Sequence, residues 1–191
     1  MLPTVHIRKE ALLILAWSAI ETHKKECIGF LLGYRPTAEN YYYSITDAVP
    51  YQNVRRRTNT EVETTDRTNK RFEEFTETIS NVYPKYLGDF HSHPEWGGMV
   101  PVYGLSEHDK REFAKSENED LALIITISSR KKGRMVWEAC EDGSIKGSIG
   151  KYNLHFNVFG AEIVEGERAA KQLRIITPRS IETLNRLWAR K

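Results

Sequence analysis

Cysteine is scarce in this chain. Only two cysteines, Cys27 and Cys140, occur among its 191 residues. Two cysteines cannot build the disulfide framework of a small secreted domain, and they cannot supply the thiolates of a cysteine-rich zinc finger. Their scarcity fits a reducing compartment, and we expect the protein to be cytoplasmic.

Long apolar runs and an excess of one charge are also missing. The apolar run at residues 11–20 follows basic residues, as in a secretion signal, but Glu10 interrupts that basic region and the run is too short to span a bilayer. The formal net charge of +2 gives no reason to expect a nucleic acid. We therefore expect neither a membrane nor a nucleic-acid partner.

What the chain does contain is typical of a globular α/β protein, with 40% hydrophobic and 28% charged residues. Its length suits one domain with a short appendage. We place the domain at residues 1–164 and expect residues 165–191 to form a C-terminal helical extension packed on it. Ile181, Leu184 and either Leu187 or Trp188 would form the apolar face of the last helix.

The hydrophobic pattern predicts alternating helices and strands. Residues 8–24 have helical spacing, with Leu12, Leu13, Ala16, Trp17 and Ile20 on one face. The other predicted helices are residues 71–84, 106–117 and 181–191. The predicted strands are residues 4–7, 27–34, 40–51, 85–94, 121–129 and 135–140. Residues 52–70 are polar without an apolar period and are predicted to form a long loop.

Two histidines stand at the end of the strand predicted at residues 85–94. Side chains at positions i and i+2 of a strand point to the same side, so His91 and His93 can converge on one metal ion. The pair alone is equally compatible with a polar loop. Asp89 lies on the same strand face, where it could support an imidazole or simply face solvent.

Asp109 strengthens the interpretation as a metal site. It follows Ser106 in the segment SEHD, at the start of a predicted helix. A structural interpretation is available, with Ser106 as the N-cap and Asp109 as its acidic partner at position N3. The two interpretations are compatible, because a cap would also hold the carboxylate still. Two histidines and one carboxylate leave a fourth tetrahedral position open, as in catalytic zinc sites.

A hydrolytic site also needs a base, and Glu26 is the candidate. It directly precedes the apolar segment CIGFLLG. On its own it could be an ordinary surface acid. Cys27, next to it, is predicted to be buried and to serve packing, not catalysis.

These segments together resemble a known enzyme family. ECIGFLLG (residues 26–33) is similar to the pattern Glu-x-x-Gly-x-Leu-x-Gly, and HSHP followed by SEHD is similar to His-x-His-Pro followed by Ser-x-x-Asp. The combination resembles the JAMM, or MPN-plus, zinc metallopeptidases over roughly residues 5–140. The resemblance implies a single MPN-type α/β domain with a mixed β-sheet flanked by helices.

The resemblance also implies roles for individual residues. His91, His93 and Asp109 would bind one Zn²⁺ per chain, Glu26 would be the general base and acid, and Ser106 would stabilise the tetrahedral intermediate. The implied reaction is hydrolysis of a peptide or isopeptide bond at the C-terminal tail of a ubiquitin-like modifier or a related sulfur-carrier protein, as in a deubiquitinase.

The sequence departs from the family pattern at one place. The family commonly has seven residues between the second histidine and the serine, whereas residues 94–105 make twelve here. The longer loop is either a harmless insertion or a recognition or gating loop. In the second case Trp96 and Tyr103 would contact the substrate.

Two other classes of function compete with the enzyme. One is a non-catalytic MPN scaffold that binds a protein partner, although Glu26 and the other four motif residues are all present. The other is a DNA-associated relative, which the near-neutral charge does not favour.

Overall fold

The computed structural model describes residues 3–79, 84–98 and 101–189, with the backbone alone for residues 187–189. Its helices are α1 (Lys9–Glu21), α2 (Asp66–Ile79), α3 (Glu107–Lys115) and α4 (Pro178–Ala189). The strands of its main sheet are β1 (Thr4–Ile7), β2 (Ile28–Tyr34), β3 (Tyr42–Pro50), β6 (Lys85–Pro94), β7 (Leu121–Ser129), β8 (Glu138–Ala139), β9 (Ile145–Ile149), β10 (Tyr152–Val164), β11 (Glu167–Leu173) and β12 (Ile175–Ile176). A separate hairpin pairs β4 (Arg56–Arg57) with β5 (Val62–Glu63).

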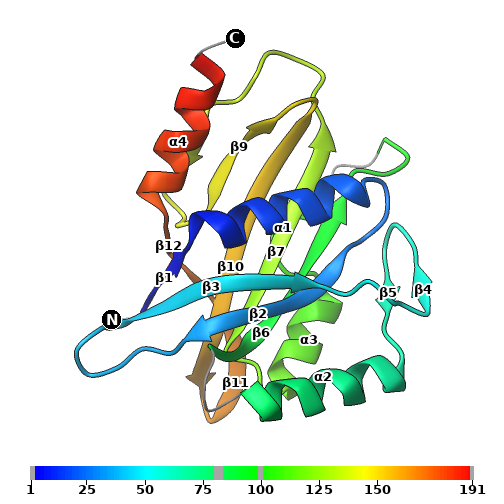
Figure 1. Cartoon of the computed structure of the whole chain (residues 1–191), viewed down its shortest axis with the longest axis vertical. Coiled ribbons are helices and arrows are strands. Elements are labelled where there is room, and N and C mark those ends of the chain that lie inside the picture. The colour runs from blue at the N-terminus through cyan, green and yellow to red at the C-terminus, as the bar shows by residue number, and fades with distance from the viewer. Residues whose placement is uncertain (1–2, 80–83, 99–100, 190–191) are drawn as a thin grey trace.

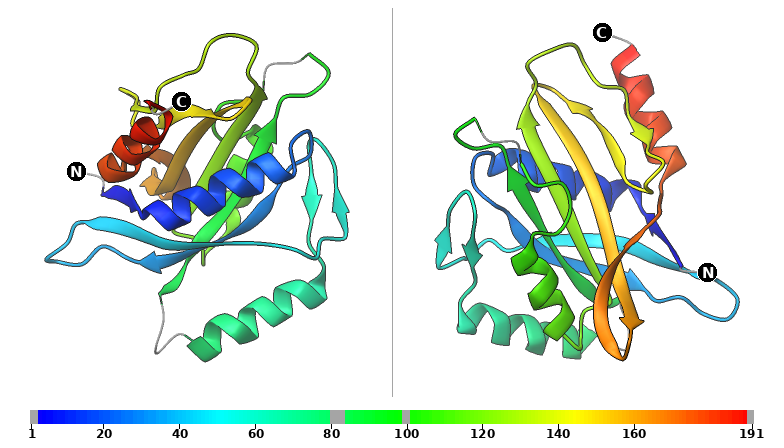
Figure 2. Two further views of the ribbon diagram at one scale, coloured as in Figure 1. Left: turned by 45° about the horizontal axis from the view of Figure 1, so that its top comes forward. Right: turned by 180° about the vertical axis from the view of Figure 1, so that it is seen from behind.

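The main sheet is mixed and strongly curled. Its strand order is β12-β1-β3-β2-β6-β7-β10-β9-β8, and β11 pairs with β10 off this path. The pairs β12–β1, β1–β3 and β6–β7 are parallel, and the others are antiparallel. Helix α1 crosses one face of the sheet, and α3 lies on the opposite face (Figures 1 and 2).

The prediction of a typical MPN-type domain is wrong. Nine strands follow one continuous path and curl into a nearly closed, barrel-like sheet that carries four helices in the described part of the chain. The sequence did not define the strands after residue 145, and these extend the sheet. The 13-residue β10 pairs with β7, β9 and β11. Because this pairing joins distant segments, the local sequence does not reveal how far each strand extends.

The central strand β7 is buried on both faces. Leu123 and Ile125 belong to the large core beneath α1, whereas Ala122 and Ile124 pack with Phe113 of α3 in a second cluster. This strand matches the predicted bounds of residues 121–129. A strand covered on both sides is expected to be continuously apolar, as this one is.

The buried face of α1 differs from the predicted one. Leu13 and Trp17, which were expected to face the core, are 42% and 60% exposed. The buried residues are Ala11, Leu12, Leu15, Ala16, Ser18 and Ala19. The buried face therefore combines two leucines, Leu12 and Leu15, with small side chains, and it is rotated away from Leu13 and Trp17.

The stretch predicted as a loop, residues 52–70, contains structure. It holds the β4–β5 hairpin and the first turn of α2, which begins at Asp66. The prediction of a loop is wrong there, because short hairpins and polar helices have no apolar period. Of the helix predicted at residues 71–84, residues 80–83 lie outside the described part.

Residues 165–191 begin as strand, not as helix. β11 and β12 join the main sheet, and helix is confined to α4. Ile181 and Leu184 pack against the main core. The side chains of Leu187 and Trp188, the other predicted members of this face, lie outside the described part.

None of the helices in the described residues is long and apolar enough to cross a membrane.

Candidate metal centre

Strand β6 presents His91 and His93 on the same face. β6 lies between β2 and β7, so its backbone is held from both sides. The imidazole centroids are 4.9 Å apart and the two Nε2 atoms are 3.1 Å apart. Ser92 points the other way and is buried, and its Oγ accepts a hydrogen bond from the Cys27 backbone N–H at 2.9 Å. The strand therefore fixes both imidazoles toward one point.

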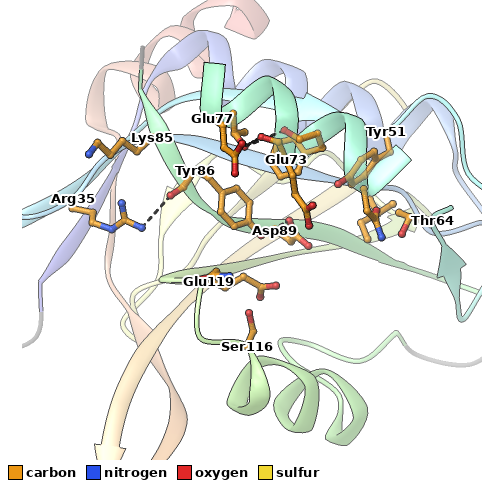
Figure 3. Close-up of a pocket in the computed structure, with 15 residues that line it drawn as sticks. Arg35, Tyr51, Thr64, Glu73, Glu77, Lys85, Tyr86, Asp89, Ser116 and Glu119 are labelled. Atoms are coloured by element: carbon orange, nitrogen blue, oxygen red, sulfur yellow. Dashed lines mark hydrogen bonds between the residues drawn. The ribbon is translucent and has the colours of Figure 1, made fainter. Parts of the chain in front are cut away.

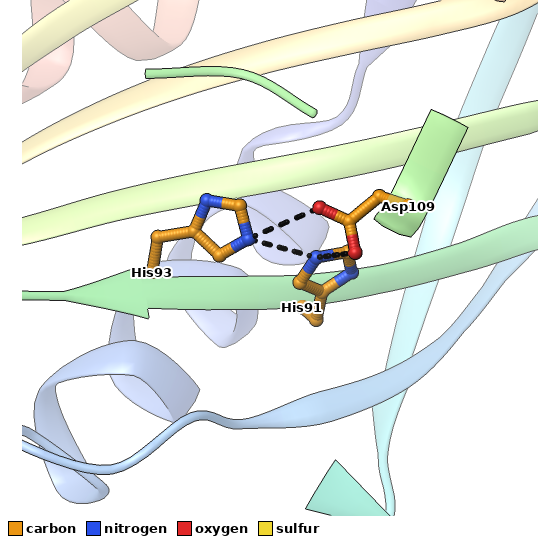
Figure 4. A group of neighbouring side chains, drawn as sticks. All are labelled: His91, His93 and Asp109. Atoms are coloured by element: carbon orange, nitrogen blue, oxygen red, sulfur yellow. Dashed lines mark hydrogen bonds and ion pairs between the residues drawn. The ribbon is translucent and has the colours of Figure 1, made fainter. Parts of the chain in front are cut away.

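Helix α3 brings Asp109 to the same point. Ser106 is the N-cap of α3 in a reciprocal capping box, which confirms the structural interpretation of SEHD. The Asp109 N–H donates to Ser106 Oγ at 3.2 Å, and the Ser106 N–H donates to Asp109 Oδ2 at 2.7 Å. Figure 4 shows the carboxylate facing both imidazoles, with Oδ1 3.4 Å from His91 Nε2 and Oδ2 3.4 Å from His93 Nε2.

These three side chains fit a metal ion. Donors around a tetrahedral zinc, bound at about 2.1 Å, lie about 3.4 Å from one another. The distances of 3.1, 3.4 and 3.4 Å among His91, His93 and Asp109 match that triangle. Imidazole and carboxylate donors are suited to zinc and to several other transition metals, so the geometry marks a metal site without identifying the ion.

The electrostatics of the triangle keep the carboxylate ionised. Burial alone would raise the pKa of Asp109, but hydrogen bonds from His91 and His93 outweigh it and hold that pKa well below its usual range. Burial alone would lower the pKa of His93, yet the hydrogen bond and the charge of Asp109 raise it overall. A metal ion would have to displace a proton shared within this cluster.

Glu26 faces the same cavity, which has a volume of about 560 Å³. The residue lies just before β2, and its backbone N–H donates to the Thr58 carbonyl at 2.7 Å. Burial raises its pKa to about 7, although the charge of His93 acts in the opposite direction. The tip of the β4–β5 hairpin, residues 59–62, lines the cavity beside it. The structure thus brings Glu26, Ser106 and the three metal-site residues together.

The two aromatic residues predicted to contact substrate lie in different places. Trp96 lines the cavity and is 52% exposed. Tyr103 does not line this cavity, and its ring lies against the ring of His155 at 5.4 Å between centroids. Of the loop at residues 94–105, residues 99 and 100 lie outside the described part.

A larger groove of about 830 Å³ runs beside the metal cavity, between α2 and β6 (Figure 3). Asp89 lies in it and accepts a hydrogen bond from the Tyr86 hydroxyl at 2.9 Å. Burial, with the charge of Glu119, raises the pKa of Asp89 to about 7. Asp89 is therefore neither a plain solvent-facing acid nor a hydrogen-bond partner of an imidazole, the two roles considered from the sequence.

Sequence reasoning missed two parts of the site. The Val102 carbonyl oxygen lies 3.2 Å from His93 Nδ1, and the hairpin tip at residues 59–62 forms one wall. Every residue has a backbone carbonyl, so residue types cannot reveal this contact. The hairpin sequence is polar and has no apolar period that would predict its strands. Only the spacing of twelve residues before Ser106 drew attention to the first of these regions.

Comparisons with known proteins add a likeness of fold. No protein-family model and no curated protein matches the sequence. Among solved structures, the solution structure of protein DSY2949 from Desulfitobacterium hafniense matches with a TM-score of 0.50 and 16% sequence identity, covering 91% of this chain and 92% of that chain. At this identity the match concerns the fold alone, so the function must be argued from the site residues.

Proposed function

We propose that this protein is a zinc-dependent hydrolase of amide bonds that works by JAMM-type metallopeptidase chemistry. The observation that carries the proposal is the donor triangle of His91, His93 and Asp109 in one cavity with Glu26. The motif resemblance supports it. The site residues carry this function and the fold does not, because the same chemistry recurs on unrelated folds.

One zinc ion per chain would be held by the triangle. Bound there, it would supply a Lewis acid that makes water acidic near neutral pH and polarises a carbonyl group. With three protein ligands, the site would have room for a water or substrate ligand, as catalytic zinc sites do. The carboxylate of Asp109 is kept in place by the capping box, so the ligand geometry does not depend on substrate.

Glu26 is the proposed proton carrier. Its carboxylate takes a proton from the attacking water and delivers that proton to the nitrogen of the departing amine. A pKa of about 7 suits both steps, because the group can bind and release a proton near neutral pH. Burial against the hairpin produces this value, and an exposed glutamate would be a weaker base.

Ser106 is the proposed hydrogen-bond donor to the oxyanion. Its Oγ accepts the Asp109 N–H, which leaves the hydroxyl proton available for donation. Ser106 lines the cavity together with Glu26. A donor fixed in advance stabilises developing charge without reorganising during the reaction.

The proposed substrate is the extended C-terminal tail of a ubiquitin-like or sulfur-carrier protein. This choice comes from the motif resemblance. An extended tail could enter the cavity between the hairpin tip at residues 59–62 and Trp96. A cytoplasmic location belongs to the proposal as well, since both cysteines are free. The proposal includes no nucleic acid.

The test replaces Glu26 with glutamine, which keeps the shape of the side chain and removes the base. We expect Glu26→Gln to retain about one zinc per chain while hydrolysis falls at least ~100-fold. Zinc is measured by elemental mass spectrometry, and hydrolysis is measured on ubiquitin-like fusions and isopeptide conjugates. Glu21→Gln, at the exposed end of α1, is the matched control and should hydrolyse at the normal rate.

Unchanged turnover in Glu26→Gln would remove Glu26 from the mechanism. A wild-type protein that binds zinc but cleaves none of these substrates would instead favour the non-catalytic scaffold.

A further inference from the structure

A backbone group of the loop between His93 and Ser106 lies beside the metal site. The Val102 carbonyl oxygen lies 3.2 Å from His93 Nδ1 and accepts a hydrogen bond from Thr126 Oγ1 at 3.2 Å. Thr126 is the residue paired with His93 across the parallel strands β6 and β7. Both side chains are largely buried, at 9% and 3% exposure. The Val102 carbonyl is thus held by contacts with both β6 and β7.

This contact determines which nitrogen of His93 carries the proton. A carbonyl oxygen can only accept, so the imidazole must donate its Nδ1–H to it. In a neutral imidazole the other nitrogen, Nε2, then carries the lone pair. Nε2 is the atom that lies 3.1 Å from His91 Nε2 and 3.4 Å from Asp109 Oδ2. The loop therefore selects the tautomer that can bind a metal.

The three residues that directly follow Val102 anchor the loop. Tyr103 places its ring against His155 of β10. Gly104 has a φ of +85°, and a Cβ added there would lie 3.0 Å from the ring of Phe159, also on β10. Leu105 is buried in the cluster that contains Phe113. These contacts with β10 and α3 fix the carbonyl independently of the two histidines.

We propose that residues 101–105 are a positioning element for His93, which holds its ring and tautomer for metal binding through the Val102 carbonyl. The inference rests on the metal site of the proposed function but not on amide hydrolysis. In this proposal, residues 101–105 are neither a harmless insertion nor a gating loop, the two alternatives that the sequence left open. Groups that orient a metal-binding histidine in this way typically contribute ~10- to 100-fold to metal affinity.

The first experiment removes the anchor at Tyr103. Tyr103→Ala loses the ring contact with His155, and because Tyr103 is 62% exposed, little core packing is lost. We expect zinc affinity, measured by competition with a chelator, to fall ~10-fold or more. Tyr103→Phe keeps the ring and should bind zinc as the wild type does.

The second experiment displaces the loop at the neighbouring residue, Gly104. Gly104→Ala introduces a Cβ against Phe159 at a positive φ, and zinc affinity should fall similarly. Gly98→Ala is the matched control, because Gly98 also has a positive φ, of +78°, but nothing lies within 4 Å of the added Cβ. Gly98→Ala should bind zinc normally.

A third measurement reads the tautomer directly in the metal-free protein. Long-range ¹H–¹⁵N spectra near pH 8 should show a proton on His93 Nδ1 in the wild type, whether or not Nε2 also carries one toward Asp109, and partial loss of the Nδ1 proton in Tyr103→Ala and Gly104→Ala. Equal zinc affinities in all variants, or His93 protonated at Nε2 and not at Nδ1 in the wild type, would overturn the inference. A wild type that binds zinc without hydrolysing any amide would contradict the proposed function and leave this inference standing.

Discussion

At the scale of single residues, Ser106 and Asp109 serve two purposes with the same atoms. The capping box satisfies backbone N–H groups at the start of α3 and places the carboxylate beside both histidines. The structural and functional interpretations of SEHD therefore describe one arrangement. The link from Ser106 to Asp109 Oδ2 uses the serine backbone N–H, so it survives any substitution except proline.

Substitutions at Ser106 can therefore separate its role as a helix cap from its proposed role in catalysis. Ser106→Gly removes the hydroxyl but costs only a few tenths of a kcal/mol at an N-cap, whereas Ser106→Ala costs ~1 kcal/mol. If the hydroxyl stabilises the oxyanion, both variants should lose ~100- to 1000-fold in kcat. Chemical denaturation measures the stability of each variant, and steady-state kinetics measures its kcat.

Ser106→Thr is the matched control, since it keeps both the hydroxyl and the cap, and it should remain active. Full activity in Ser106→Gly would restrict Ser106 to its role as a helix cap.

At the scale of elements, the short β4–β5 hairpin affects the pKa of Glu26, a residue from another part of the chain. The Thr58 carbonyl of the hairpin accepts a hydrogen bond from the Glu26 N–H, and the tip at residues 59–62 helps to line the cavity. Burial is the largest cause of the raised pKa of Glu26, and the negative charge of Glu61 adds to it. A hairpin with only two paired residues on each strand thus bears on the chemistry of the site.

Neutralising Glu61 should shift the pH dependence of the enzyme. Rate falls as pH drops through the pKa of Glu26, because protonation removes the base. Glu61→Gln removes a charge that raises this pKa, so the acid limb of the kcat/KM profile should move to lower pH. The expected shift is roughly 0.2 to 0.7 of a pH unit, as exposed charge pairs contribute ~0.2 to 1 kcal/mol.

Glu63→Gln is the control for this shift. Glu63 lies on the same hairpin but does not line the cavity, and it is not among the charged residues that shift the pKa of Glu26. An acid limb that moves equally in both variants, or moves to higher pH in Glu61→Gln, would exclude the proposed effect.

At the scale of the whole molecule, the metal site lies between the main sheet and helix α3. The histidines stand on a central strand of the curled sheet, and Asp109 comes from the helix on one of its faces. Phe113 secures that helix to β7 through the second core cluster. A metal bound by the native triangle would connect β6 to α3, and unfolding would have to release it.

Zinc should therefore stabilise the folded protein. At a free zinc concentration 100 times its Kd, the free energy of unfolding should rise by about 2.7 kcal/mol. In a chain of this length, that corresponds to a Tm higher by roughly 5 to 10 °C than in chelator-treated protein. Calorimetry with and without the chelator measures the difference.

His91→Ala should show no zinc-dependent shift in Tm, since it lacks one ligand. An equal shift in this variant would mean that zinc binds elsewhere in the protein.

The sequence by itself determined the features that are local. The apolar runs predicted the bounds of β1, β6 and β7 and came within two residues of those of β2 and β3, and the segment SEHD predicted the capping box. The strand period placed His91 and His93 on one side. Each of these features depends on neighbouring residues, whose spacing sets the direction of the side chains.

Only the tertiary structure decided how distant segments meet. The curl of the sheet depends on the pairing of β10 with three other strands, and the wall beside Glu26 depends on where the hairpin folds. The hydrogen bond from His93 to Val102 involves a backbone carbonyl, which every residue carries, so no pattern of residue types could reveal it. Residue types thus determined which groups could bind a metal, and long-range packing decided which backbone would hold them in place.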